Sequence, residues 1–213
     1  MVRVLIADDH PLFRSGLIAV LSNVSDIAIV GEAADGNEAL SRARALKPDL
    51  ILLDVAMPGK NGIEVLTQLH EEIPDIKVLM LSVFPERQYA IRCLKNGANG
   101  YATKDMRPAE LITAIRKVSE GGKFVSPLLA ELLAFEIGSD TGRLPHEELS
   151  DREFQILCLL GQGNTVTEIA GILSLSVSSV NTYRSRILSK MHLHTTAQII
   201  RYVLDNNLAV VNK

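Results

Sequence analysis

The chain has 213 residues and a formal net charge of −3, with 47% hydrophobic and 22% charged residues. This composition is that of a folded globular protein with one large domain or two small ones, and it excludes a mainly disordered chain. The longest purely apolar runs, such as residues 50–53, hold only a few residues, whereas a membrane span needs about 20. The first residues do not have the layout of a signal peptide, and the two cysteines, Cys93 and Cys158, lie far apart. We therefore expect a cytoplasmic protein with no membrane contact, no disulfide framework and no cysteine-based zinc site.

Five short apolar runs alternate with segments of helical period through the first half of the chain. The runs cover residues 2–7, 27–30, 50–53, 78–83 and 100–102, and the helical segments cover residues 11–21, 37–46, 62–72, 87–96 and 108–120. Runs that are apolar throughout indicate strands buried on both faces, and their alternation with helices indicates βαβ units. The sequence therefore predicts a doubly wound α/β domain with a five-stranded parallel sheet in the flavodoxin-like order 2-1-3-4-5.

The pattern changes after the glycine pair at residues 121–122. A short apolar helix is expected at residues 128–137, and residues 138–145 have the composition of a linker. From residue 149 onward every segment reads as a helix, and each begins with a residue type that caps helix N-termini well. The expected caps are Ser150, Thr165, Ser176 and either Thr195 or Thr196.

Three parts are therefore expected: a domain at residues 1–122, a linker with one short helix at 123–145, and an all-α domain of four helices at 146–213. Their charges differ. Residues 126–149 hold one basic and five acidic side chains, and residues 150–213 hold six basic and four acidic ones. A mildly basic last third behind an acidic connector is compatible with nucleic-acid binding, although charge alone does not establish it.

Polar side chains follow the ends of four of the predicted strands. Asp8 and Asp9 follow the first strand and Asp54 the third, and in the predicted order these strands are neighbours, so three carboxylates converge. Carboxylates this close repel one another, and Mg²⁺ is the natural cation to neutralise them. Ser82 and Lys104 follow the fourth and fifth strands and suit the oxygens of an anion. A single strand-end Asp is usually a turn or a cap, but the full set indicates a site for a phosphoryl group carried by one carboxylate.

These residues occur in motifs that resemble the receiver domain of bacterial two-component response regulators. The resemblance covers about residues 1–120 and rests on Asp-Asp-His at 8–10, Asp-Val-Ala-Met-Pro-Gly-Lys-Asn-Gly at 54–62, Ser82 and Lys104-Asp105. It implies that Asp54 accepts a phosphoryl group from a sensor histidine kinase. It also implies that the domain promotes only its own phosphorylation and dephosphorylation, so an enzyme acting on other substrates is not expected.

The same resemblance assigns a magnesium site around Asp54. It implies that Asp9, Asp54 and the backbone carbonyl of Ala56 bind Mg²⁺ directly, while Asp8 supports the ion. It also places Ala56 and Phe84 beside the phosphoryl group. Neither side chain can orient an attacking water, so we expect slow self-dephosphorylation.

Three further residues form a switch in the family. By the resemblance, Lys104 pairs with the phosphoryl oxygens, Ser82 moves to hydrogen-bond them, and Tyr101 changes rotamer with Ser82. Without the resemblance, the residue type alone favours a half-buried packing aromatic at Tyr101.

The longest predicted helix of the last domain has one apolar face. Val177, Val180, Ile187 and Met191 lie on it at helical spacing. Elsewhere on the helix lie small polar side chains with cations at the edges, namely Asn181, Thr182, Arg184, Ser185, Arg186, Ser189 and Lys190. Amide and hydroxyl groups can read base edges in a DNA major groove while cations bind phosphates. A solvated surface helix fits the same pattern.

A longer set of motifs resembles the LuxR-type helix-turn-helix over about residues 146–210. It comprises Leu-Ser-Asp-Arg-Glu at 149–153, Gly163, Glu-Ile-Ala at 168–170, Leu-Ser-Val at 175–177, Ser-Val-Asn-Thr-Tyr at 179–183 and Lys-Met at 190–191. A receiver followed by this module defines the NarL/FixJ family of response regulators, and residues 180–184 resemble its GacA/UvrY branch. The resemblance implies a transcription regulator controlled by phosphorylation, with a scaffold helix at 165–173 and a recognition helix at 176–191.

The family positions imply which residues contact double-stranded promoter DNA. They are Thr165, Asn181, Thr182, Tyr183, Arg184, Ser185, Arg186 and Lys190; of these, Asn181, Thr182 and Ser185 are candidates for reading bases, and Tyr183, Arg184, Arg186 and Lys190 for binding phosphates. Thr167 stands where many members have a cation, and the module's net charge is low. One copy should therefore bind weakly, which makes a homodimer over two half-sites important. The expected dimer interface is Ile199, Ile200, Val203 and Leu204 of the last helix, unless these residues only close the four-helix core.

Two other function classes fit part of the sequence. A Mg²⁺-dependent phosphatase of the haloacid-dehalogenase type shares the strand-end Asp, Ser and Lys, but it uses a second Asp where Ala56 stands. A phosphorylation-independent DNA-binding protein with a vestigial receiver is disfavoured by the intact acidic and basic set. We expect no metal at His146, His192 or His194, which have no carboxylate pattern beside them.

Overall fold

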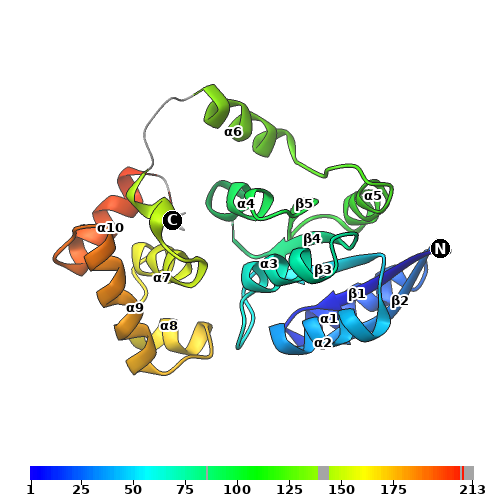
Figure 1. Cartoon of the computed structure of the whole chain (residues 1–213), viewed down its shortest axis with the longest axis horizontal. Coiled ribbons are helices and arrows are strands. Elements are labelled where there is room, and N and C mark those ends of the chain that lie inside the picture. The colour runs from blue at the N-terminus through cyan, green and yellow to red at the C-terminus, as the bar shows by residue number, and fades with distance from the viewer. Residues whose placement is uncertain (85, 139–143, 207, 209–213) are drawn as a thin grey trace. The chain divides into compact units, whose positions relative to one another are not determined.

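A computed structural model describes residues 1–84, 86–138, 144–206 and 208. Its contacts divide the chain into two compact units, Met1–Leu133 and Ala134–Lys213, whose elements are labelled in Figure 1. The division falls within the segment predicted as a linker, so the domain boundaries expected at residues 122 and 146 stay a prediction. Residues 139–143 of that linker lie outside the described residues. Among the residues described, no helix is both long and apolar enough to cross a membrane.

The first unit is built around a parallel sheet of five strands in the order β2-β1-β3-β4-β5. The strands are β1 (Val2–Ala7), β2 (Ile27–Ala33), β3 (Leu50–Asp54), β4 (Lys77–Ser82) and β5 (Gly100–Thr103). Every residue of β3 is buried, as an unbroken apolar run predicts for a strand covered on both faces. The predicted fold class and strand order are confirmed, although β2 continues to Ala33 instead of ending at residue 30.

Five helices connect and follow these strands: α1 (Pro11–Leu21), α2 (Gly36–Leu46), α3 (Gly62–Glu72), α4 (Glu86–Lys95) and α5 (Pro108–Ser119). α1 and α5 cover one face of the sheet, where Leu17, Leu21 and Ile115 join the buried side chains of the strands. α2 and α3 pack against each other on the opposite face. Because helices shield both faces, the carboxyl ends of the strands are the edge at which side chains can meet a ligand.

The helix α6 (Pro127–Gly138) follows α5, as the sequence predicts. The second unit contains a short 3₁₀ helix, η1 (Pro145–Glu148), and the helices α7 (Asp151–Gly161), α8 (Val166–Ile172), α9 (Val177–Lys190) and α10 (Thr196–Asp205). α7 packs against α9 and α10, and α8 packs against α9. The four α-helices predicted for this part of the chain are confirmed, and η1 is an element that the periodicity did not predict.

Local hydrogen bonds explain where the helices of the second unit begin. Each N-cap side chain accepts a hydrogen bond from the amide three residues later; the caps are Ser150, Thr165, Ser176 and Thr195. At every one of these caps except Ser176, a Glu or Gln side chain also bonds the amide of the capping residue, which completes a capping box. Of the two threonines considered, Thr195 therefore starts α10.

Candidate functional site

Three carboxylates and an imidazole meet at the carboxyl ends of β1 and β3. Asp8 and Asp9 follow β1, and Asp54 is the last residue of β3. Asp8 is 0% and Asp54 1% exposed, and one ligand atom from each of Asp8, Asp9, His10 and Asp54 lies within 4.8 Å of the others. Because β1 and β3 are neighbours in the sheet, the structure brings the three predicted carboxylates together.

The Lys104 ammonium lies between two of these carboxylates. Its Nζ atom is 2.7 Å from Asp8 Oδ2 and 2.7 Å from Asp54 Oδ2. Burial raises the pKa of Asp54 to about 7; the charge of Lys104 opposes this shift and the charge of Asp8 adds to it. Burial by itself lowers the pKa of Lys104, but the two carboxylates raise it overall. The single Lys104 charge does not balance three carboxylates, so negative charge is left in excess.

This excess negative charge fits a divalent cation. Asp8, Asp9 and Asp54 offer hard carboxylate oxygens, the ligands that Mg²⁺ prefers. Burial raises the pKa of Asp54, because the Lys104 charge offsets only part of the cost of burying the ionised carboxylate. The Ala56 amide donates to Asp54 Oδ1 at 3.2 Å, which helps to hold the carboxylate in place. His10, which was not predicted as a ligand, also belongs to the cluster, with its Nδ1 atom 2.7 Å from Asp9 Oδ1. Its position directly after Asp9 was the available signal.

Ser82, Phe84 and Tyr101 are joined by two hydrogen bonds at the ends of β4 and β5. The Phe84 amide donates to Ser82 Oγ at 3.0 Å, and the Tyr101 hydroxyl donates to the Phe84 carbonyl oxygen at 2.8 Å. Ser82 and Tyr101 are both 0% exposed, and burial raises the pKa of Tyr101 well above its usual value. Tyr101 is therefore fully buried with a specific partner, and the half-buried packing aromatic that its residue type favours is wrong.

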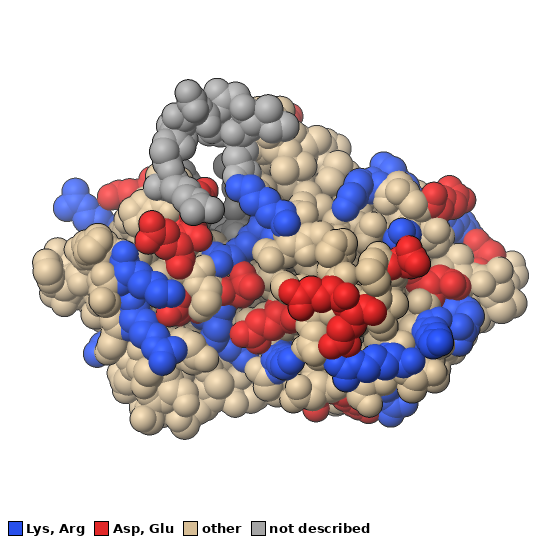
Figure 2. All heavy atoms as spheres, in the orientation of Figure 1, with Lys and Arg blue, Asp and Glu red and all other residues tan. Residues whose placement is uncertain are grey.

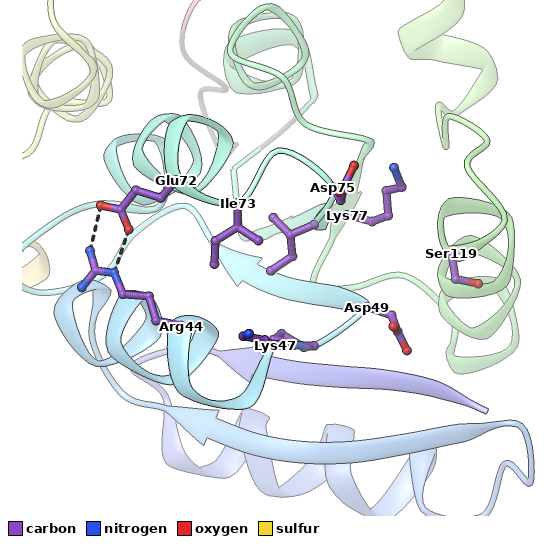
Figure 3. Close-up of a pocket in the computed structure, with 10 residues that line it drawn as sticks. Arg44, Lys47, Asp49, Glu72, Ile73, Asp75, Lys77 and Ser119 are labelled. Atoms are coloured by element: carbon purple, nitrogen blue, oxygen red, sulfur yellow. Dashed lines mark hydrogen bonds and ion pairs between the residues drawn. The ribbon is translucent and has the colours of Figure 1, made fainter.

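A separate hollow lies at the opposite, amino-terminal edge of the same sheet (Figure 3). It has a volume of about 640 Å³ and is lined by Arg44, Lys47, Pro48, Asp49, Glu72, Ile73, Asp75, Ile76, Lys77 and Ser119. Along one side, the Arg44 guanidinium forms a bidentate ion pair with Glu72, with N–O distances of 2.7 and 2.9 Å. The residues that line the hollow include none of the predicted site residues, and their charges are mixed, with three basic and three acidic side chains.

The helix α9 presents small polar side chains on consecutive turns. Thr182, Ser185 and Arg186 are exposed, while Asn181 and Tyr183 are half-buried. The Thr182 and Ser185 hydroxyls each donate to the carbonyl oxygen four residues earlier, at 3.0 Å. Figure 2 shows Lys and Arg side chains interspersed with Asp and Glu on the face in view. The three candidate base-reading residues thus lie on one short stretch of one helix.

Three other predicted DNA contacts already have partners within the second unit. Lys190 Nζ lies 2.6 Å from Glu153 Oε2, and Glu153 is only 3% exposed. Arg184 donates to the Thr196 hydroxyl at 3.3 Å. Thr165 is the N-cap of α8. The capping role of Thr165 is the one that the sequence predicts, whereas the partners of Lys190 and Arg184 were not predicted.

The apolar face of α9 is shorter than predicted. Val180 and Ile187 are 0% and Met191 is 5% exposed, whereas Val177 is 45% exposed. The prediction that Val177 belongs to the buried face is wrong, because this residue is the first of α9 and lies at the end of the helix.

Two of the four expected dimer residues lie in the core. Ile199 and Val203 are 0% exposed, and a Cβ at Gly161 of α7 would lie 2.2 Å from Val203 Cγ1. These two residues close the helical core, which is the other role considered for them, and they are not accessible to a second chain. Ile200 is half-buried and Leu204 is 44% exposed, so only these two remain available for a dimer contact.

Two family models match the chain, one for each unit. The model of the response regulator receiver domain matches residues 4–116, and that of the bacterial regulatory proteins of the luxR family matches residues 147–203. Response regulator GacA of Pseudomonas viridiflava is 40% identical over 200 residues, which cover 93% of this chain and 94% of GacA. Response regulator UvrY of Escherichia coli K12 is 34% identical over 209 residues, which cover 98% and 96% of the two chains.

A solved structure supports the same assignment. The crystal structure of a two-component response regulator of the LuxR family from Aurantimonas sp. SI85-9A1 is 32% identical, with a TM-score of 0.61, and the match covers 65% of this chain and 99% of that one. The receiver model alone spans more than half of this chain. The chain therefore belongs to the NarL/FixJ family of response regulators, in which a receiver domain precedes a LuxR-type DNA-binding domain, and it matches the GacA/UvrY branch of that family.

Proposed function

We propose that this response regulator is switched by phosphorylation of Asp54. The observation that carries the proposal is the placement of Asp54, buried at the end of β3 with its Oδ2 atom 2.7 Å from the Lys104 ammonium. A sensor histidine kinase supplies the phosphoryl group. An Asp54 oxygen forms the new bond to phosphorus, while the bond from phosphorus to the kinase imidazole breaks and the imidazole nitrogen keeps the electron pair. The chain transfers no group to other substrates.

In this proposal, Asp9, Asp54 and the Ala56 carbonyl would hold Mg²⁺, and Asp8 would support the ion. When bound, the ion neutralises charge on the phosphoryl oxygens. Lys104, already in contact with Asp8 and Asp54, pairs its ammonium with the same oxygens. The excess of carboxylates over cations in the cluster supports this assignment.

The switch residues read the new charge. In this structure Ser82 Oγ accepts a hydrogen bond from the Phe84 amide. When Ser82 turns to donate to a phosphoryl oxygen, that contact changes, and Tyr101, which is bonded to the Phe84 carbonyl, moves with the loop. The surface around β4 and β5 is thereby altered, which changes receiver contacts and dimerisation.

The second unit then binds promoter DNA as a dimer. We assign the domains to residues 1–122 and 146–213, joined by the linker at 123–145. The helix α9 is the recognition helix: Asn181, Thr182 and Ser185 read bases, and Tyr183 and Arg186 bind phosphates. Thr165, Arg184 and Lys190 contact DNA only if they give up their present contacts within the second unit. The exposure of Leu204 and the partial exposure of Ile200 support a dimer contact through α10.

One experiment on the full-length protein tests this function. Molecular mass and DNA binding are measured at fixed salt with Mg²⁺, with and without acetyl phosphate, using a random-sequence duplex pool whose bound fraction is sequenced. We expect acetyl phosphate to promote dimers, tighter binding and a selected sequence in the wild type and in Asp75→Ala, whose residue lies in the separate hollow. Asp54→Ala should show none of these changes. Equal stimulation of the Asp54→Ala protein would contradict the proposal.

A further inference from the structure

The segment between α5 and α6 is attached to the edge strand β5. The Phe124 amide donates a hydrogen bond to the Asn99 carbonyl at 2.9 Å, and the Phe124 carbonyl accepts one from the Tyr101 amide at 3.3 Å. These two bonds form a parallel β-bridge between Phe124 and Gly100. A Cβ at Gly100 would lie 2.8 Å from the Phe124 carbonyl oxygen, so this close approach requires glycine. Phe124 therefore extends the sheet beside the strand that carries Tyr101.

A second attachment holds the start of α6 to α4. The Ser126 hydroxyl donates to Glu86 Oε2 and accepts the Leu129 amide at 3.0 Å. The Ser126 carbonyl accepts the Ala130 amide, also at 3.0 Å. Ser126 is therefore the N-cap of α6. Glu86, in the first turn of α4 and 9% exposed, fixes the orientation of that cap.

Both attachments adjoin the proposed switch. Glu86 lies two residues after Phe84, whose carbonyl oxygen accepts the Tyr101 hydroxyl. Tyr101 is in turn bonded through its own amide to Phe124. Phe84 therefore lies two residues from Glu86, which holds Ser126, and one hydrogen bond from Tyr101, whose amide holds Phe124. These contacts all lie within the first unit.

We infer that Glu86 and Ser126 form a latch, which transmits the phosphorylation state of Asp54 to the N-terminus of α6 and so to the segment that precedes the DNA-binding domain. The inference rests on the proposed phosphorylation of Asp54. Glu86 and Ser126 are positioning residues: they orient the N-terminus of α6 and contact neither the phosphoryl group nor DNA. When the first turn of α4 moves, Glu86 releases the Ser126 hydroxyl, and the first turn of α6 opens more readily because its cap is no longer held.

Amide hydrogen exchange of the full-length protein tests the latch. Exchange is followed on the peptide covering residues 124–134 in Mg²⁺, with and without beryllofluoride as the phosphoryl analogue. In the wild type we expect beryllofluoride to speed exchange of the capped amides about fivefold, the size expected from losing a helix cap. Ser126→Ala and Glu86→Ala should exchange fast under both conditions. Ser126→Thr, which keeps the hydroxyl, should retain the response. Ser119→Ala removes a hydroxyl that donates to the Arg116 carbonyl within α5 and should behave as the wild type.

The outcomes separate the latch from the function on which it rests. Uptake of one phosphoryl group from acetyl phosphate is measured by intact mass in each variant. If the wild type takes up the group but exchange of residues 124–134 does not respond to beryllofluoride, the latch is overturned and the phosphorylation of Asp54 stands. If the wild type takes up no group and does not respond, both proposals are overturned. A Ser126→Ala protein that responds like the wild type also overturns the latch.

Discussion

The Tyr101 hydroxyl donates a hydrogen bond of 2.8 Å to the main-chain carbonyl oxygen of Phe84. Tyr101 lies in β5, and Phe84 lies in the loop that follows the neighbouring strand β4. The bond therefore joins β5 to the loop at the end of β4. The Phe84 amide is bonded to Ser82 Oγ. Two hydrogen bonds therefore connect the edge of the proposed phosphoryl site with the interior of the edge strand.

Removal of the Tyr101 hydroxyl should weaken both the fold and the switch. Tyr101→Phe keeps the buried ring but leaves the Phe84 carbonyl without its partner, which should lower the free energy of unfolding by about 1–2 kcal/mol. Urea denaturation at neutral pH measures this loss. Phosphoryl uptake at Asp54 should persist while stimulation of dimerisation falls. Tyr183→Phe, at a half-buried position of α9, is the matched control and should lose no stability; equal stability of Tyr101→Phe and wild type would contradict the role of this bond.

Asp54 should make the protein less stable as the pH rises. Its pKa is about 7 in the folded chain against 3.8 ordinarily. Between these values the folded state holds a proton that the unfolded state has lost, so the free energy of unfolding is highest below the ordinary pKa and falls as the pH rises through the folded pKa.

Asp54→Asn removes this titration. The variant should be close to the wild type in stability near pH 4 and more stable by about 1–3 kcal/mol above pH 7 in the absence of divalent ions. Urea denaturation across this range, with Asp75→Asn as the control, measures the difference. Added Mg²⁺ should narrow it, because the ion stabilises the ionised wild-type carboxylate. A variant no more stable than the wild type at high pH would show that burial of Asp54 carries no cost.

The phosphoryl group on Asp54 should be lost slowly. Ala56 has no polar side-chain group, and Phe84 is 7% exposed with its ring 4.7 Å from that of Tyr89, so neither side chain can orient water. The label from radioactive acetyl phosphate should therefore persist well beyond seconds in Mg²⁺ without a phosphatase. Ala56→Asn introduces an amide at this position and should speed the loss at least about tenfold. Decay of the wild-type label within seconds would contradict the prediction.

Arg186 and Lys190 are both cations of α9, but replacing Arg186 should weaken DNA binding, whereas replacing Lys190 should lower the stability of the fold. Arg186 is exposed, with its guanidinium 5.9 Å from the centre of the Tyr183 ring, so Arg186→Ala should weaken binding to all duplexes and reduce the salt slope by about 1. Lys190→Ala leaves the buried Glu153 carboxylate without its ion pair and should lower the free energy of unfolding by about 1 kcal/mol. Salt-dependent anisotropy with labelled duplex and urea denaturation measure the two effects. The assignment fails if the two variants lose stability equally.

The sequence by itself determined the elements and the position of the acidic site. Apolar runs and helical periods depend on residues within one strand or one turn, so β3 and α9 could be predicted to within a residue or two, and Ser150 caps α7 as expected. Asp8 and Asp54 could be placed together because a parallel sheet brings the carboxyl ends of neighbouring strands to one edge.

Only the tertiary structure decided which side chains are free to act. Ile199 and Ile200 are adjacent and equally apolar, yet Ile199 is fully buried while Ile200 stays partly accessible. Lys190 meets Glu153, and Ser126 meets Glu86, across separations of 37 and 40 residues. Periodicity indicates which face of a helix is apolar, but it does not indicate which residue of a distant element lies opposite, because that depends on how the elements pack against one another.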